Sequence, residues 1–304
     1  VVEARLAALP TGRFDAAADY AAPIPVAVIG ALLGVDVADY PKFRAWSEAV
    51  MTIFDPARSE AEAGAGQAAV EAIGDYLDSA MAARRGGGPD DLTDDLIGDL
   101  LAAQAAGAPL SASEIRVNCF NLLLGGNLTT ADLISSGLHL LLANPDQLAR
   151  LRADPALIGQ AVEETLRLEP PTLGAQRVAA RAMEVAGCPV HAGQVVAVSI
   201  ERANRDPAVF PEPDRFDIGR HDGPHLSFGA GAHICIGAAL ARLEAKVAIL
   251  ALIQRFPRLA LADPNAPPAW RPAPYFRGLA RLEVVAGKEP RPLDPIEGKG
   301  SLPL

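Results

Sequence analysis

The spacing of apolar residues predicts helices along the first two-thirds of the chain. Apolar positions recur three and four residues apart in the segments 24–33, 40–54, 68–83 and 94–105, a spacing that places them on one face of a helix. A longer pattern runs without proline from residue 111 to residue 142. Ser111 and Glu114 have the spacing of a capping box at its start, and Asn144-Pro145 follows its end. The sequence therefore predicts one helix long enough to cross most of a domain.

Two further helices follow the long one, and from residue 176 the pattern changes to short strands and turns, with one more helix near the end. Helices are predicted over 146–152, 155–168 and 237–256, strands over 178–186, 194–200 and 279–285, and a proline-punctuated loop over 206–224. The fold class that follows is mainly α with a small β component. The segment 84–89 is predicted to be an exposed loop, and 287–304 a polar tail or linker.

Charge and cysteine content narrow the classes of function. The chain of 304 residues carries 27 Lys and Arg against 37 Asp and Glu, a net charge of −10, which argues against nucleic acid or an anionic membrane surface as the main partner. We see no signal peptide and no long charge-free apolar run of the transmembrane kind. Three scattered cysteines favour a reducing, cytoplasmic compartment.

The densest chemical signal is the segment 228–237, Phe-Gly-Ala-Gly-Ala-His-Ile-Cys-Ile-Gly. Its small residues let the backbone approach a large flat group, and Cys235 precedes a predicted helix whose N-terminus favours a thiolate. A thiolate in such a loop suits haem iron, and His233 could reach a carboxylate of the same ligand. Two alternatives remain at this point: a glycine-rich turn with a buried free cysteine, or a zinc site made with Cys188 and His191.

Two further segments need an explanation. Glu164 and Arg167 lie three apart on a predicted helix among apolar neighbours, so they form either a buried pair or an ordinary surface ion pair. Gly125 and Gly126 interrupt the long predicted helix, at a cost of about 1 kcal/mol each relative to alanine. They indicate a flat ligand beside the helix, a locally widened turn, or close packing of two helices.

Taken in order, these segments resemble the cytochrome P450 family. The segment 228–237 matches the family's haem loop, Phe-x-x-Gly-x-(His/Arg)-x-Cys-x-Gly, at every specified position, namely Phe228, Gly231, His233, Cys235 and Gly237. Glu164 and Arg167 resemble the Glu-x-x-Arg pair, and Arg215 takes the place of the second arginine that completes a buried triad. Arg177 resembles the basic residue beside a haem propionate.

The middle of the long helix resembles the distal helix of the same family, (Ala/Gly)-Gly-x-(Asp/Glu)-Thr. Thr129 stands where the family has the threonine that assists oxygen activation, and Gly126 and Asn127 precede it. Leu128 replaces the usual acid, so the resemblance leaves the route of proton delivery open. Asn127 and Thr130 are the nearest polar side chains in sequence, and Asn127 could only position water.

The resemblance implies a cytochrome P450 fold that is N-terminally incomplete, with a haem domain over 1–286 that lacks the family's leading helices. Haem b would be bound through the thiolate of Cys235. A pocket for a small or medium apolar organic substrate would be formed by Phe120, Leu124, Thr172, Leu173, Tyr275 and Phe276.

The expected function is that of a haem-thiolate monooxygenase. Its electrons would come from an external ferredoxin and reductase, because the sequence has no flavin, nicotinamide or iron–sulfur motif. Arg242 and Lys246, four apart, are either a basic docking face for that donor or two ordinary solvated residues. The alternatives are a peroxide-driven or non-oxygenating haem enzyme, suggested by Leu128, and a haem-binding protein without turnover.

Overall fold

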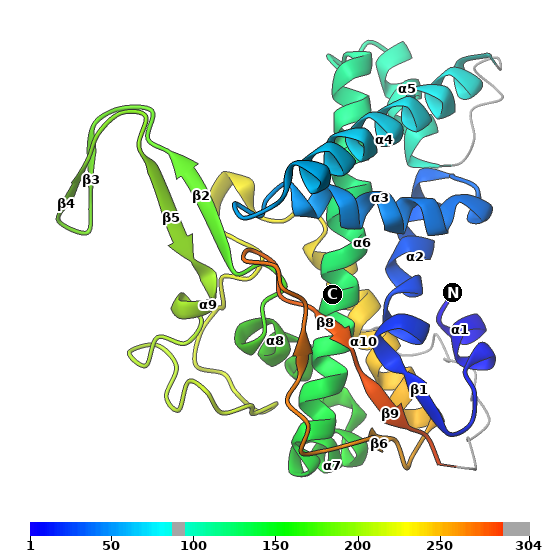
Figure 1. Ribbon diagram of the computed structural model, residues 1–304, viewed down its shortest axis with the longest axis vertical. Helices are drawn as coiled ribbons and strands as arrows, with labels where there is room; N and C mark the ends of the chain where they lie inside the picture. Colours follow the sequence, from blue (N-terminus) through cyan, green and yellow to red (C-terminus); the bar gives the residue numbers. More distant parts are fainter. Residues whose placement is uncertain (87–94, 288–304) are drawn as a thin grey trace.

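The computed structural model describes residues 1–86 and 95–287, and one long helix organises them. This helix, α6 (Ala112–Ala143), runs through the length of the molecule (Figure 1). The predicted capping box is confirmed, because the Glu114 backbone N–H donates to Ser111 Oγ at 3.2 Å and the Glu114 carboxylate accepts from the Ser111 N–H at 2.7 Å. The helix ends at Asn144, as the following proline predicts.

One apolar cluster surrounds the first half of α6, and we call it the amino-half cluster. From α6 it takes Ile115, Cys119 and Leu123. The helices that contribute its other side chains are α2 (Pro23–Leu33), α3 (Tyr40–Thr52), α4 (Glu60–Gly86) and α5 (Leu96–Ala105). In Figure 1, α3 and α4 cross α6 near one end of the molecule.

Helix α4 is longer than its apolar pattern predicts, and part of the expected loop 84–89 is helical. Arg84 ends up in a buried ion pair with Asp95, and its Nη2 also donates to the Gly34 carbonyl at 2.8 Å. These interactions attach the end of α4 to α2 and α5, which is why the helix continues to Gly86. Residues 87–89 of the predicted loop, and 288–304 of the predicted tail, lie outside the described residues.

A second cluster, the carboxy-half cluster, surrounds the rest of α6. It includes Leu133 and Leu141 of α6 together with Val162 and Ile249. Its helices are α1 (Val2–Ala8), the π-helical turn η1 (Ala16–Ala21), α7 (Pro145–Ala153), α8 (Ile158–Leu168) and α10 (Ala238–Arg255). An antiparallel sheet of order β1-β9-β6 borders it, with β1 at Arg13–Asp15, β9 at Glu283–Val285 and β6 at Ala260–Leu261.

The apolar segment 16–33 is long and apolar enough to pass as a membrane span, which the sequence analysis did not anticipate. In the structure 67% of this segment is buried. It comprises η1 and α2, and Tyr20 of η1 donates from Oη to the Ala248 carbonyl at 2.7 Å. Burial of this kind is what a core helix of the fold shows.

The late β component forms two antiparallel hairpin-like units. An arm projects from the helices in Figure 1 and consists of β2 (Gly174–Val178) paired with β5 (Val195–Ser199) and β3 (Met183–Val185) paired with β4 (Cys188–Val190). The second unit pairs β7 (Ala269–Trp270) with β8 (Leu279–Arg281). The short helix α9 (Ile200–Ala203) follows β5. The strands predicted over 178–186 and 279–285 are therefore each divided between two strands.

Candidate functional site

The Cys235 loop is a tight turn that leads directly into α10. Gly229 and Gly231 both have a φ of 72°, a left-handed conformation that glycine adopts without strain. The loop closes where the Cys235 N–H donates to the Phe228 carbonyl at 2.8 Å. Gly237 is the N-cap of α10, so Cys235 lies at the positive end of the helix dipole, which favours a thiolate.

The exposed face of this loop fits a haem group. Cys235 is exposed and offers a soft sulfur donor. A Cβ built on Gly231 would meet nothing within 4 Å, and Ile234 and Ile236 are 61% and 88% exposed. An apolar surface with a central thiolate and little side-chain bulk is what a flat, apolar macrocycle with iron at its centre requires.

A buried ion pair lies behind this loop, as the sequence predicts. Arg167 donates to Glu164 twice, from Nε at 2.7 Å and from Nη2 at 2.9 Å, and both side chains are nearly inaccessible. Arg167 Nη1 also donates to the carbonyls of Asn204 and Pro213. Asn204 in turn accepts from the Leu226 N–H at 2.8 Å. The pair therefore holds the backbone just before the Cys235 loop.

The prediction that Arg215 completes the triad is wrong, because Arg220 does so. Arg220 donates from Nε to Glu164 Oε1 at 3.1 Å, and its side chain is 9% exposed. Arg215 is 55% exposed and pairs with Glu212 instead. It is the Arg215 carbonyl that faces the triad, where it accepts from Arg167 Nη2 at 3.1 Å and from Arg220 Nη2 at 3.2 Å.

Thr129 and Gly125 share a turn of α6, and Thr129 Oγ1 donates to the Gly125 carbonyl at 2.6 Å. A Cβ on Gly125 would meet nothing within 4 Å, whereas one on Gly126 would lie 3.4 Å from Ile29 of α2. The glycine with open space beside it is thus Gly125, whereas Gly126 faces α2, and a catalytic role for Gly126 stays a prediction. Since α6 is α-helical through both glycines, the turn is not widened.

Asn127 also lies elsewhere than predicted. Its side chain is fully buried, and Nδ2 is 3.3 Å from Ser47 Oγ of α3. It therefore belongs to the contact between α3 and α6 and cannot position water beside Thr129. Leu128 is buried as well, at 5% exposure.

The predicted pocket residues from the second half of the chain come together. Thr172 and Phe276 form an isolated β-bridge, and the Leu173 N–H donates to the Tyr275 carbonyl at 3.0 Å. The ring of Phe276 lies 5.7 Å from that of Phe54 in the connection between α3 and α4. Sequence analysis missed Phe54, because the apolar pattern places it at the end of a helix. Phe120 and Leu124 of α6 are partly buried against the amino-half cluster.

The remaining predicted residues are exposed, and their proposed contacts with haem are still predictions. His233 ends the 3-10 turn η5 (Gly231–His233), and Arg177 of β2 donates from Nη1 to the Gln176 carbonyl at 2.8 Å. Cys188 lies on the projecting arm. Within residues 1–86 and 95–287, no group of three or more His, Cys, Asp or Glu side chains is placed to hold a metal, so the zinc alternative has no geometric support.

The predicted basic docking face consists of Arg242 and Lys246, and Arg242 forms an ion pair that the sequence did not reveal. Arg242 donates to Glu163 from Nε at 2.7 Å and from Nη2 at 2.9 Å. Its charge is therefore matched by a carboxylate, and Lys246 of the predicted pair is only partly exposed. The prediction of a face made by both residues is not supported in that form.

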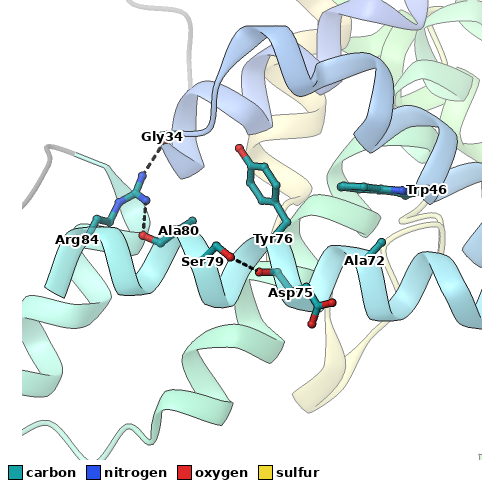
Figure 2. Close-up of a pocket in the computed structure, with 8 residues that line it drawn as sticks. All are labelled: Gly34, Trp46, Ala72, Asp75, Tyr76, Ser79, Ala80 and Arg84. Carbon is teal, nitrogen blue, oxygen red and sulfur yellow. Dashed lines mark hydrogen bonds between the residues drawn. The ribbon is translucent and has the colours of Figure 1, made fainter. Parts of the chain in front are cut away.

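A separate pocket of about 510 Å³ lies between α3 and α4, and Figure 2 shows its lining. The Trp46 and Tyr76 side chains project from the two helices, and the Arg84 guanidinium reaches the Gly34 carbonyl at one end (Figure 2). No predicted site residue lines this pocket: its lining is Gly34, Trp46, Ala72, Asp75, Tyr76, Ser79, Ala80 and Arg84.

Comparison with known proteins gives one family. The family model described as Cytochrome P450 matches residues 60–269. Cytochrome P450 monooxygenase PikC of Streptomyces venezuelae is 40% identical over 285 residues, which are 93% of this chain and 66% of the relative. 6-deoxyerythronolide B hydroxylase of Saccharopolyspora erythraea is 40% identical over 275 residues, which are 90% of this chain and 66% of that protein.

Solved structures agree with these relatives. The crystal structure of P450BioI in complex with hexadec-9Z-enoic acid ligated acyl carrier protein matches with a TM-score of 0.84 and 37% identity, over 90% of this chain and 69% of that one. The myxobacterial cytochrome P450 CYP267B1 in complex with myristic acid matches with a TM-score of 0.87 and 40% identity, over 95% and 70%. The chain thus spans about two-thirds of the length of the curated relatives it matches, 66% and 64% for two of them.

Proposed function

Because this chain belongs to the cytochrome P450 family, we propose that it carries the haem-thiolate core of a monooxygenase, with Cys235 as the iron ligand. The observation that carries this proposal is the exposed Cys235 thiol, which lies just before the N-cap of α10 in a loop whose backbone is tied to a buried ion triad. Three unpaired cysteines suit a reducing, cytoplasmic setting.

The bound haem would supply the cleavage of the O–O bond of O2, which delivers one oxygen atom to an organic substrate. The chain's own residues would orient and protect that chemistry. The N-terminal end of α10 stabilises the negative charge of the Cys235 sulfur, and the Phe228 carbonyl fixes the Cys235 backbone by accepting its N–H. The Thr129 hydroxyl donates a hydrogen bond to the Gly125 carbonyl, so its oxygen is left as an acceptor that can hold a water or a hydroxyl.

The test is the ferrous–CO spectrum of the haem-loaded protein. A thiolate ligand gives a strongly red-shifted Soret band, and we expect it in the parent and in Cys188→Ser, which removes another exposed thiol. Cys235→Ser should lose the band. A parent without it, or a Cys235→Ser variant that keeps it, would overturn the proposal.

We propose a small or medium apolar molecule as the substrate, since four of the six predicted pocket residues have apolar side chains, namely Phe120, Leu124, Leu173 and Phe276. Two structurally similar proteins carry fatty acyl chains in their solved structures. Myristic acid is therefore a suitable first probe. It should shift the haem spin state, and acetate, which has the same carboxylate without the chain, should not.

We propose that an external ferredoxin and reductase supply the electrons. Leu128 favours one alternative, peroxide-driven oxygenation, because leucine at this position has no proton to donate. Turnover with NAD(P)H and a redox chain supports the monooxygenase. Turnover with hydrogen peroxide alone would favour the alternative.

A further inference from the structure

A cluster of charged and aromatic side chains holds the start of the Cys235 loop against α8. We call it the Glu163 cluster, and it consists of Glu163, His225, Phe228 and Arg242. Glu163 of α8 accepts from Arg242 Nε at 2.7 Å and Nη2 at 2.9 Å. His225 Nε2 is 3.1 Å from the same carboxylate, and the Arg242 guanidinium carbon lies 4.5 Å from the centre of the Phe228 ring.

The hydrogen bonds define the charge of each member of the cluster. His225 Nδ1 accepts from the Ser227 N–H at 3.2 Å, so the ring proton is on Nε2 and points to Glu163, which a neutral imidazole satisfies. Burial acts to raise the pKa of Glu163, but the hydrogen bonds from His225 and Arg242 and the positive charge of Arg242 outweigh it, so that pKa lies below its usual value. The cluster therefore has one negative charge, one positive charge and no net charge.

The cluster is linked to Cys235 in two ways. Through the backbone, the Phe228 carbonyl accepts the Cys235 N–H at 2.8 Å, and Ser227 Oγ donates to the Leu166 carbonyl of α8 at 2.6 Å. Through space, a negative charge on Cys235 acts on Arg242 and raises the pKa of the guanidinium, although less than the hydrogen bond to Glu163 does. The attraction is mutual, so Arg242 favours the thiolate.

We propose that Arg242 and Glu163 are paired positioning residues that set the electrostatic potential at the Cys235 sulfur. Arg242 stacks on Phe228 and favours negative charge on the sulfur, while Glu163 holds the guanidinium in place and offsets its charge. The inference rests on the proposed function, because it takes Cys235 to be the haem ligand. It adds that the two charges have opposite effects on the bound iron.

The charges make a prediction that packing alone does not. Removal of the Arg242 charge leaves Glu163 uncompensated beside the loop, so the site resists an added electron and the ferric–ferrous reduction potential falls. Removal of the Glu163 charge leaves the guanidinium uncompensated, so the potential rises. With both removed, the local net charge returns to zero.

The experiment is a spectroelectrochemical titration of the haem-loaded protein. Arg242→Gln should lower the potential, Glu163→Gln should raise it by a comparable amount, and the double variant should return close to the parent. Arg215→Gln removes the same charge from an exposed arginine outside the cluster and should leave the potential unchanged. Arg242→Lys keeps the charge without the planar fork, so its potential should stay nearer the parent than that of Arg242→Gln.

Shifts of the two single variants in the same direction, or no shift in either, would overturn the inference and make the cluster a packing contact. If one single variant holds haem poorly, the other still tests the inference, because the sign of each shift is predicted separately. The ferrous–CO band of the parent separates the two claims. Its absence would overturn the proposed function and this inference together, whereas its presence with same-sign shifts would overturn this inference alone.

Discussion

At the scale of single residues, the structure assigns Arg220 as the third member of the triad with Glu164 and Arg167. Arg220 is buried against Glu164 and also donates to the carbonyls of Pro211 and Glu212, whereas the Arg215 side chain is exposed. Arg220→Ala should cost about 3–5 kcal/mol of unfolding free energy, because Glu164 stays buried with one partner fewer. Arg215→Ala should cost less than about 1 kcal/mol.

Urea denaturation of the two variants measures both costs. The substitutions are matched, since each removes one arginine from the same loop. Equal losses, or the larger loss in Arg215→Ala, would contradict the assignment of Arg220 to the triad.

Glu244 of α10 is a second residue whose environment has a measurable consequence. It is 7% exposed, Oε2 has no hydrogen-bond partner among the described residues, and burial raises its pKa from 4.5 to about 8. Between these two values the folded protein holds a proton that the unfolded chain releases, so stability falls as the pH rises. Each unit of raised pKa corresponds to about 1.4 kcal/mol once the group is charged in both states.

Glu244→Gln should remove this part of the pH dependence. We expect the free energy of unfolding of the variant, relative to that of the parent, to rise steadily from pH 5 to pH 8, by at least about 2 kcal/mol at pH 8. Urea unfolding at several pH values gives the two curves, with the exposed Glu184→Gln as control. Parallel curves for parent and Glu244→Gln would mean that Glu244 is charged in the fold at little cost.

At the scale of elements, the β7–β8 hairpin is fixed to α6 by an ion pair whose aspartate is buried, and this pair leaves no room for a side chain at Gly278. Asp132 of α6 pairs with Arg271, and a Cβ on Gly278 would overlap both charged groups. Gly278→Ala should therefore displace the hairpin and cost about 1–3 kcal/mol. Because this hairpin carries Tyr275 and Phe276, the change should also alter ligand binding in the proposed pocket.

Gly64→Ala is the matched control, because a Cβ there meets nothing within 4 Å in α4. It should stabilise the helix by up to about 1 kcal/mol. Thermal unfolding compares the two substitutions. A Gly278→Ala variant as stable as Gly64→Ala would show that the hairpin accommodates a Cβ beside Asp132 and Arg271.

The elements also show what a sequence can and cannot specify. The long helix, its capping box and its end at Asn144 were predictable, because apolar spacing and caps are local properties. The faces of that helix were not. Gly125 and Gly126 are equivalent in sequence, and only the position of Ile29 on α2 decides which one has open space beside it.

The candidate site follows the same division. Cys235 and the Glu164–Arg167 pair were predictable, because their spacing along the chain carries the chemistry. The choice between Arg215 and Arg220 depends on the path of a loop that has no periodic pattern. Likewise, Asn127 is a polar residue whose partner, Ser47, is distant in sequence, so its burial could not be inferred.

At the scale of the whole molecule, α6 passes through both apolar clusters, and this should make them unfold together. The chain has two tryptophans, and each borders a different cluster: Trp46 the amino-half cluster and Trp270 the carboxy-half cluster. Trp270→Phe leaves a reporter in the first, and Trp46→Phe leaves one in the second. We expect coincident fluorescence transitions in urea once each variant is referenced to its own circular dichroism. Separate midpoints within one variant would show that α6 breaks between the clusters.

The different environments of the three cysteines allow the haem content of the protein to be measured by thiol labelling. Cys119 is buried, and burial raises its pKa to about 11, while Cys188 and Cys235 are exposed. A maleimide reagent on the native protein should therefore label Cys188 and Cys235 when haem is absent, and Cys188 alone when iron occupies the sulfur of Cys235. Intact-mass spectrometry then gives the loaded fraction directly as the share of singly labelled chains among the singly and doubly labelled ones, without a spectrum or a substrate.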